Sequence, residues 1–431
     1  MLRTLFVDFN SYFASVEQQV KPHLRGRPVG VVPLMAETTS CIAASYEAKK
    51  FGVRTGTGVA EARRLCPEIV FVEAKHEIYV EFHELAVAAV DRIAPVRQVL
   101  SIDEMECELT GRWRERERAV DLANKVKREV ESTVGECLTS SIGIAPNTLL
   151  GKLASNMQKP NGLTVIELSD VPGKLLPLGL RDISGVGPRM LQRLQRCNIH
   201  TVEQLYAAPR DLLHTAWGGL AGDDMYDRLR GRWYGPRETD TKSLGHSHVL
   251  PPDMRHPQGA LDVLNRLTHK AAMRLRKQGF FATGMSVSVR CGHRYQREAS
   301  GQRDTRFGQT QDTGFFLHVL HELWNSGLST LPSPQLVGMT LHGLVPVAQH
   351  TPSLFDQPDE AAAGQPEPQA CVSEVVNAKP ARDRSRLYTA MDGVNKAYGK
   401  NALYFAGSHR ALDHAPMRIA FNRIPDIETE R

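Results

Sequence analysis

The sequence predicts an α+β fold in several domains, and three observations support this. The chain has 431 residues, enough for about three or four domains of roughly 150 residues each. Hydrophobic residues make up 41% of it and charged residues 23%, which is ordinary for a globular protein with apolar cores. Strand-like and helix-like segments alternate before residue 165 but mix hairpins with crossovers, which favours a sheet with helices on one face.

The first segments show the alternation clearly. Leu5 to Val7 is a short apolar run that ends at Asp8, and Tyr12, Phe13 and Val16 then recur at helical spacing, so a buried strand leads into a helix. Similar patterns predict strands at 30–32 and 139–144, helices at 43–50, 78–93, 119–130 and 148–157, and a hairpin that pairs 96–102 with 105–109.

A glycine-containing segment begins the part rich in short helices and arginines. The run from Ile183 to Pro188 contains Gly185 and Gly187, is followed by Arg189, and resembles a helix-hairpin-helix. Its glycines would let backbone N–H groups at a helix start approach a phosphate, a contact that holds nucleic acid without reading sequence. An ordinary glycine-containing turn is the alternative.

Residues 242–431 fall into three parts. Alternating stretches within 242–347, with helices near 261–277 and 313–324, predict a separate small α/β domain. Residues 348–384 are interpreted as a flexible linker, because 356–378 is rich in Ala, Pro, Gln and Glu. Residues 385–431 regain apolar positions, but their fold is not assigned.

Charge and cysteine usage narrow the class of protein. The net charge of +5 suits a polyanionic partner without requiring one. Seven dispersed cysteines form no Cys-x-x-Cys pair and are interpreted as reduced thiols. No basic segment followed by an apolar one begins the chain, and no apolar run approaches the ~18 residues that span a bilayer. We therefore expect a soluble cytoplasmic protein without a membrane partner.

Three acidic residues form the candidate chemical centre. Asp8 ends the first strand, and Asp103 and Glu104 occupy the turn of the predicted hairpin, so the acids could meet on neighbouring strands. Converging carboxylates repel unless a cation neutralises them, and hard oxygen ligands favour Mg²⁺ or Mn²⁺. Two such ions would support nucleotidyl transfer. From the spacing alone, the acids could equally be solvated turn residues.

An ordered set of motifs supports the chemical interpretation. The segments of the set are Val7 to Glu17, Ala44 to Val53, Ser101 to Glu104, Ser141 to Ile144 with Asn147, and Lys159 to Gly162. Together they resemble the Y-family translesion DNA polymerases of the bacterial polymerase IV and V type, and the resemblance covers residues 1 to about 344.

The resemblance implies a right-hand polymerase of the α+β class with an additional C-terminal little finger. The palm is then expected at 1–21 and 75–165, the small fingers at 22–74, and the helical thumb with its helix-hairpin-helix at 166–234. The little finger is expected at 242–347, the linker at 348–384 and a tail at 385–431. The tail resembles polymerase V-type tails only loosely.

The resemblance also implies roles for individual residues. Asp8, Asp103 and Glu104 match the ligands of two Mg²⁺ ions, for which Mn²⁺ could substitute, and the carbonyl of Phe9 is a further expected ligand. The expected nucleotide-binding residues are Tyr12, Phe13, Tyr46, Lys49 and Lys159, among which Phe13 matches the aromatic gate that excludes ribonucleotides.

Three positions depart from the family pattern. Many relatives carry Arg where this chain has Lys49, and lysine cannot form the planar bidentate fork with phosphate. Ala43 stands where a hydroxyl residue often contacts the triphosphate. Some relatives carry a second acid at Asn10, which leaves a metal-ligand role for this residue in doubt.

The expected function is template-directed, low-fidelity DNA synthesis past lesions. The expected partners are primer-template DNA, deoxynucleoside triphosphates and a sliding clamp, and the sequence leaves open whether accessory subunits are also needed. Thr351 to Phe355 looks like a clamp-binding peptide with Leu354 and Phe355 as apolar anchors, although Thr351 replaces the usual glutamine and a coincidental linker sequence is the alternative. The alternative function is a catalytically silent polymerase fold that binds DNA and the clamp.

Overall fold

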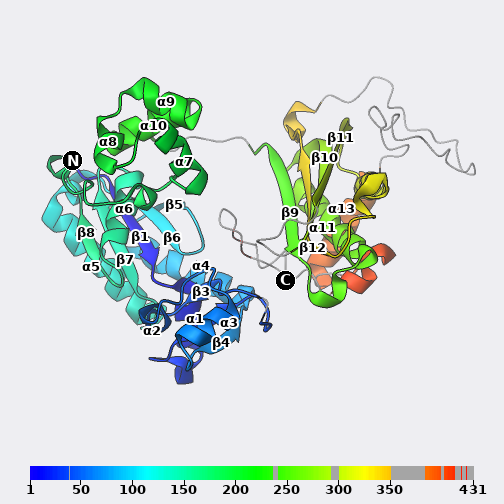
Figure 1. Cartoon of the computed structure of the whole chain (residues 1–431), viewed down its shortest axis with the longest axis horizontal. Helices are drawn as coiled ribbons and strands as arrows, with labels where there is room; N and C mark the ends of the chain where they lie inside the picture. Colours follow the sequence, from blue (N-terminus) through cyan, green and yellow to red (C-terminus); the bar gives the residue numbers. More distant parts are fainter. Residues whose placement is uncertain are drawn as a thin grey trace, which may run out of the picture. The chain divides into compact units, whose positions relative to one another are not determined.

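The chain divides into two compact units (Figure 1). The computed structural model describes residues 1–37, 39–235, 241–292, 300–350, 384–398, 402–412, 419 and 424. The first unit covers Met1–Arg237 and also contains Ile419 and Ile424, and the second begins at Glu238. Each unit combines helices with at least one sheet, so the α+β prediction is confirmed.

A five-stranded sheet organises the first unit. Its order is β5-β6-β1-β7-β8, with β7 and β8 parallel and the other neighbours antiparallel. Leu5, Val7 and Phe9 alternate along β1 toward one face and share a buried core with α4 and α5. The elements are β1 (Thr4–Phe9), α1 (Tyr12–Val20), α4 (His76–Ile93), β5 (Val96–Val99), β6 (Glu104–Glu108), α5 (Arg116–Thr133), β7 (Ser140–Ala145), α6 (Thr148–Met157) and β8 (Leu163–Val165).

Helices cover both faces of this sheet, whereas the sequence favoured one. α4 and α5 lie on the face described above, and α6 contacts β7 and β1. Its Gly151 approaches Gly143 of β7 so closely that a Cβ added to Gly143 would lie 1.9 Å from the Gly151 carbonyl oxygen. The missing side chains therefore let α6 dock closely on β7, the strand that pairs with β1 and faces Asp8 across the sheet register.

Two smaller substructures complete the first unit. A three-stranded sheet of order β3-β2-β4 has a core of its own, built with α2 and α3. Four short helices surround a further core that includes Leu194, Leu205 and Leu213. The elements are β2 (Val29–Val32), β3 (Ala43–Ala44), α2 (Tyr46–Lys50), α3 (Val59–Leu65), β4 (Val70–Glu73), α7 (Pro188–Arg196), α8 (Val202–Ala207), α9 (Arg210–Trp217) and α10 (Leu220–Leu229).

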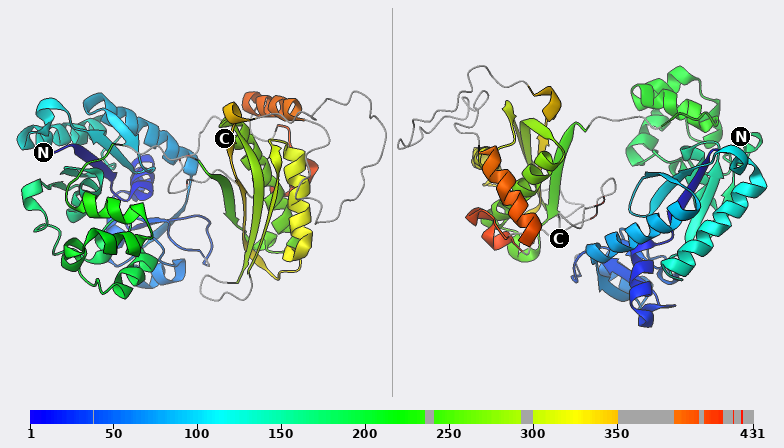
Figure 2. Two further views of the ribbon diagram at one scale, coloured as in Figure 1. Left: turned by 90° about the horizontal axis from the view of Figure 1, so that it is seen from above. Right: turned by 180° about the vertical axis from the view of Figure 1, so that it is seen from behind.

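A five-stranded antiparallel sheet organises the second unit, with β13 paired to β10 beside a path of four strands (Figure 2). Its order is β11-β10-β12-β9; Val287 and Val289 of β10 are buried with α11 and α12, while Arg290 is exposed. This is the alternation predicted for strands with one polar face. The elements are β9 (Ser243–Val249), α11 (Pro257–Lys277), β10 (Phe280–Cys291), β11 (Ser300–Thr310), α12 (Thr313–Leu323), β12 (Pro334–His342) and β13 (Val345–Pro346), which pairs with β10.

The sequence assigned no fold to the tail, and its described part at 384–412 packs on the helical layer of this unit, whereas Ile419 and Ile424 pack against the core of the first unit. Helix α13 (Ser385–Tyr398) presents Asp392 to Arg276 of α11 in a two-point ion pair of 2.7 and 2.9 Å. Tyr388 is buried, and its hydroxyl accepts a hydrogen bond from the Gly314 N–H over 3.0 Å. Apolar burial and a half-buried ion pair thus hold the tail on the domain.

Truncating Tyr388 is expected to destabilise the second unit. Tyr388→Ala removes a side chain that is only 2% exposed, and such cavities cost about 3 kcal/mol in the free energy of unfolding. Tyr398→Ala is the matched control, because Tyr398 is 81% exposed at the end of the same helix and its loss should cost about 0.5 kcal/mol or less. Urea unfolding of the full chain measures both, and equal stabilities would contradict this account of the tail.

Two further sequence predictions concern cysteines and membranes. The six cysteines in the described ranges, all except Cys371, are free. Within those same ranges, no helix combines the length and apolar character needed to cross a membrane.

Candidate active site

The three candidate acids lie on adjacent backbone segments, although 95 residues of sequence separate Asp8 from Asp103. In the antiparallel pairing of β1 with β6, Asp8 lies opposite Glu104. The Phe9 N–H donates to the Asp103 carbonyl oxygen over 2.8 Å, so the turn that carries Asp103 is fixed to the same strand. The sequence placed Glu104 in the turn, but it is already the first residue of β6.

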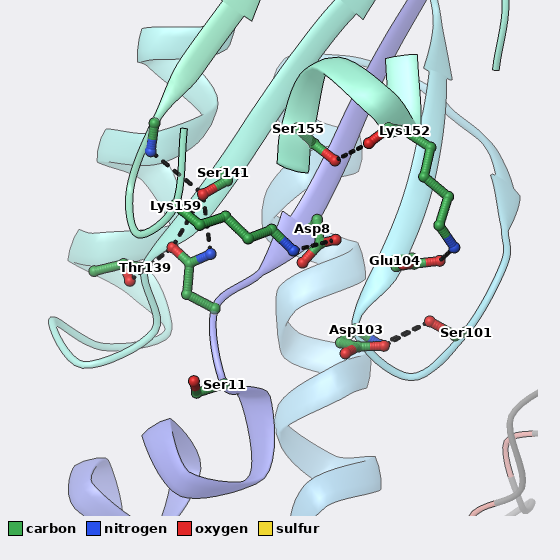
Figure 3. A network of polar contacts seen from close by, with 12 residues as sticks. Asp8, Ser11, Ser101, Asp103, Glu104, Thr139, Ser141, Lys152, Ser155 and Lys159 are labelled. Atoms are coloured by element: carbon green, nitrogen blue, oxygen red, sulfur yellow. Dashed lines mark hydrogen bonds and ion pairs between the residues drawn. The ribbon is translucent and has the colours of Figure 1, made fainter. Parts of the chain in front are cut away.

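Each acidic side chain has its own partner (Figure 3). Lys159 Nζ lies 2.7 Å from Asp8 Oδ2, and Lys152 Nζ lies 2.6 Å from Glu104 Oε2. Ser101 Oγ donates to Asp103 Oδ1 over 2.6 Å. Two ammonium groups therefore neutralise two of the three acids.

Asp8 is the most electrostatically unusual of these groups. Burial raises the pKa of its carboxyl to about 6, the Lys159 ammonium opposes this increase, and the nearby Glu104 and Asp103 carboxylates add to it. A buried carboxyl beside two other acids is costly to ionise unless a cation compensates. The site therefore favours positive charge at Asp8.

The donor set suits a hard divalent cation, but the side chains do not converge on one point. Within the described parts of the chain, no three His, Cys, Asp or Glu side chains are grouped as a metal site. The metal-ligand role of the three acids stays a prediction; the strand pairing sets Asp8 opposite Glu104, and each acidic side chain contacts its own partner. The physical reason is that like-charged carboxylates separate and turn to the nearest ammonium or hydroxyl, so a divalent ion would have to displace Lys159 and Lys152.

The expected gate residue has a rigid support. The half-buried Phe13 ring stacks on Tyr79, with ring centroids 4.5 Å apart and planes 18° apart, and the Tyr79 hydroxyl donates to Glu17 Oε1 over 2.8 Å. His76 meets Phe13 edge-on at 6.1 Å, and the Ile419 N–H donates to His76 Nδ1 over 3.4 Å. Contacts on two sides therefore restrain the Phe13 ring.

Tyr12 differs from the other expected nucleotide-binding residues because it is buried. Its hydroxyl donates to the Tyr79 carbonyl oxygen over 2.7 Å. Burial, with a smaller effect from Asp103, raises its pKa well above the usual tyrosine value. Tyr12 is therefore neutral, and its hydrogen bond to Tyr79 of α4 fixes the start of α1, the helix that carries Phe13.

Tyr46 and Lys49 lie in the electrostatic surroundings of Asp8. Lys49 Nζ lies 4.3 Å from the centre of the Tyr46 ring and donates to Ser11 Oγ over 2.7 Å. Burial lowers the pKa of Lys49, and the neighbouring Lys159 ammonium lowers it further, whereas Asp8 opposes the decrease. Two lysines near one aspartate make this region attractive to a polyanion.

Sequence reasoning did not single out Lys152. This residue is the only charged one in α6 and reaches from the helix to Glu104. A lone lysine in an otherwise uncharged helix was the available signal. It could have been read as the partner of an acid on the sheet that this helix covers.

In the segment predicted to be a helix-hairpin-helix, a turn leads into α7, and the motif itself stays a prediction. Gly185 has a φ of +94°, and Gly187 is the N-cap residue of α7, with Pro188 at its first position. Gly185, Gly187 and Arg189 are all exposed. Their DNA-binding role stays a prediction, as does the role of Leu354 and Phe355, which lie outside the described residues.

Comparison with known proteins identifies the family. Residues 7–156 match the model of the impB/mucB/samB family, and residues 241–354 match that of its C-terminal domain. DNA polymerase IV of Moorella thermoacetica is 35% identical over 368 residues, covering 83% of this chain and 90% of the relative. DNA polymerase IV of Pelotomaculum thermopropionicum is 32% identical over 412 residues, 94% of each chain.

Solved structures show the same fold. A chimeric Y-family DNA polymerase superposes with a TM-score of 0.66 at 24% identity, over 80% of this chain and 99% of the other. The insertion ternary complex of Dbh DNA polymerase gives a TM-score of 0.55 with the same identity and coverage. The fold is therefore a right-hand polymerase fold, and the chain belongs to the Y family of translesion DNA polymerases, as a DNA-directed DNA polymerase.

Proposed function

We propose that this polymerase copies damaged templates with low fidelity by two-metal-ion nucleotidyl transfer, with Asp8, Asp103 and Glu104 as the metal ligands. One observation carries the proposal: the β1–β6 pairing sets Asp8 opposite Glu104, and the Asp103 turn is bonded to the same strand. Acids on two strands can then hold ions at a fixed distance from a primer end.

The three carboxylates, with the Phe9 carbonyl, would hold two Mg²⁺ ions, for which Mn²⁺ could substitute. When bound, such ions activate the attacking hydroxyl and stabilise the leaving pyrophosphate. Lys159 and Lys152 neutralise Asp8 and Glu104 in this structure. With metal ions on the carboxylates, the two ammonium groups would be available to the phosphates. The lysines therefore stabilise the ionised carboxylates while no metal ion is bound. Once ions and nucleotide bind, they would offset the negative charge of the phosphates.

The incoming deoxynucleotide would contact residues around Asp8. Lys159, Lys49 and Tyr46 would bind its triphosphate, and Phe13 would lie under the sugar. Lys49 supplies a single ammonium where an arginine would supply a fork, so nucleotide affinity is expected to be lower than in relatives with arginine. Tyr12 would support the helix that carries Phe13 through the hydrogen bond that its hydroxyl donates to the Tyr79 carbonyl oxygen.

Primer-template DNA and the sliding clamp are the proposed macromolecular partners. Dbh has been solved in insertion ternary and post-insertion binary complexes, which supports nucleotide and DNA binding by the common fold. The DNA phosphate backbone would be contacted by Gly185, Gly187 and Arg189. The sliding clamp would be bound through the apolar side chains of Leu354 and Phe355. Accessory subunits, which the sequence left open, are not part of this proposal.

Primer extension by the full chain tests the proposal. We expect template-directed extension with deoxynucleotides and Mg²⁺, loss of extension on chelation, and recovery when Mg²⁺ is restored. Synthesis should also continue past an abasic site in the template. If DNA is bound but never extended with Mg²⁺ or Mn²⁺, the chain is the catalytically silent adaptor instead.

A further inference from the structure

Asn10 ties three segments of the first unit together with one buried amide. Its side chain lies two residues beyond Asp8 and is 1% exposed. Its Nδ2 donates to Ser141 Oγ over 3.0 Å, and its Oδ1 accepts from the Asn161 N–H over 2.7 Å and from Thr139 Oγ1 over 3.2 Å. The amide therefore connects the end of β1 with β7 and with the loop that follows α6.

The loop that Asn10 fastens is the one that carries Lys159. Figure 3 shows Lys159 extending from the side of Ser141 and Thr139 toward Asp8, where the ion pair spans 2.7 Å. The Gly162 N–H at the end of this loop donates to Ser141 Oγ over 3.3 Å. Asn10 and its partner Ser141 thus hold the two backbone N–H groups that follow Lys159-Pro160.

Steric contacts leave this loop little freedom to move. A Cβ on Gly162 would lie 1.9 Å from the Gln158 carbonyl oxygen, and Asn161 has a φ of +54°. On the more exposed side, Lys127 Nζ donates to the carbonyl oxygens of Asn161 and Gly162 over 2.6 and 2.9 Å. A left-handed residue is stable only where its surroundings fix it, and the Asn10 bond to its N–H does so from the buried side.

A metal-ligand role for Asn10, which the occasional acid at this position in relatives suggested, does not fit these contacts. An amide oxygen has two lone pairs, and Asn161 N–H and Thr139 Oγ1 already point at the Asn10 oxygen. The Nδ2 group donates and cannot bind a cation. The role of Asn10 must therefore concern the loop.

We propose that Asn10 is a positioning residue that fixes the Lys159 loop and so sets where the Lys159 ammonium meets the triphosphate. Loss of the amide frees the Asn161 N–H and the end of β1, and Lys159 then samples positions away from the nucleotide. The kinetic part of this inference rests on the proposed function. Its effect should appear in the KM for deoxynucleotide, because a loosely held ammonium weakens ground-state binding first.

Single-nucleotide insertion kinetics test the proposal in five variants, one of them the Asn10→Ala, Lys159→Ala double variant. Asn10→Ala is expected to raise the KM for deoxynucleotide about tenfold, the value of one or two buried hydrogen bonds, with a smaller change in kcat. In a Lys159→Ala background the same substitution should add no further increase. Asn10→Asp keeps an acceptor for the Asn161 N–H and should stay within about threefold of the unchanged chain. Thr139→Val removes one donor and should show a weaker effect in the same direction.

Three outcomes would overturn the proposal. One is an Asn10→Ala effect of equal size with and without Lys159. Another is a lower Mg²⁺ requirement for Asn10→Asp, which indicates a metal ligand. The third is a similar KM increase in Asn265→Ala, the matched control, whose buried amide donates to the Gly407 carbonyl oxygen in the second unit.

Hydrogen exchange gives a readout that does not depend on activity. The amide of Asn161 should exchange about tenfold faster in Asn10→Ala than in the unchanged chain or in Asn10→Asp. Unaltered exchange would refute the fastening of the loop even if the kinetics changed. Conversely, a chain that never extends primers but shows this exchange pattern would reject the proposed function and leave the role of Asn10 in the loop intact.

Discussion

Alanine in place of Asp103 is expected to lower the rate of primer extension by about a thousandfold. Removing a group that stabilises charge in the transition state usually has an effect of this size. Asp103 lies half-exposed in the turn before β6, and its side chain accepts a hydrogen bond from the neighbouring Ser101. The substitution therefore removes a proposed ligand without opening a cavity in the core. Rapid-quench extension with Mg²⁺ measures the effect on kcat.

Asp121→Ala is the matched control for this substitution. Asp121 is an exposed acid of α5, paired with Lys125 over 2.8 Å, and its loss changes the net charge by the same amount at a position outside the candidate site. We expect unchanged extension and an unchanged melting temperature. If Asp103→Ala extends primers as well as the unchanged chain, Asp103 is no ligand. If neither the unchanged chain nor Asp121→Ala extends primers, the catalytically silent adaptor function is favoured.

Local signals allowed parts of the fold to be predicted closely. The helix expected at 148–157 is α6, Thr148–Met157, because Asn147 caps it by accepting a hydrogen bond from the Leu150 N–H and its apolar residues follow the helical period. The strand that ends near Asp8 was similarly evident from Leu5 to Val7. Such features depend on residues a few positions apart, which a sequence displays directly.

Contacts between distant segments were not predictable in the same way. The direction of the acidic side chains depends on Lys152 and Lys159, which are distant in sequence from the acids they pair with. The place of the tail likewise depends on Arg276 and Gly314, to which Asp392 and Tyr388 of α13 are complementary only once the second unit has folded. Periodicity reveals that an element exists but not which surface it covers.

Phe13→Ala is expected to raise the efficiency of ribonucleotide insertion relative to deoxyribonucleotide insertion by about a hundredfold. Exclusion by a ring requires that the ring cannot move aside, and Phe13 stacks 4.5 Å from Tyr79 on one side while His76 meets it edge-on. Removing the ring opens space for a 2′-hydroxyl without disturbing the acids. The ratio of kcat/KM for the two nucleotide types measures the change.

Tyr79→Phe separates the gate from its support. This variant keeps the ring that stacks on Phe13 but removes the hydroxyl that donates to Glu17, so the chain should lose stability and still exclude ribonucleotides. If discrimination falls as far as in Phe13→Ala, the position of the ring matters more than its presence. If Phe13→Ala still rejects ribonucleotides, another side chain makes the exclusion, because a methyl group at this position cannot reach the sugar that a phenyl ring would touch.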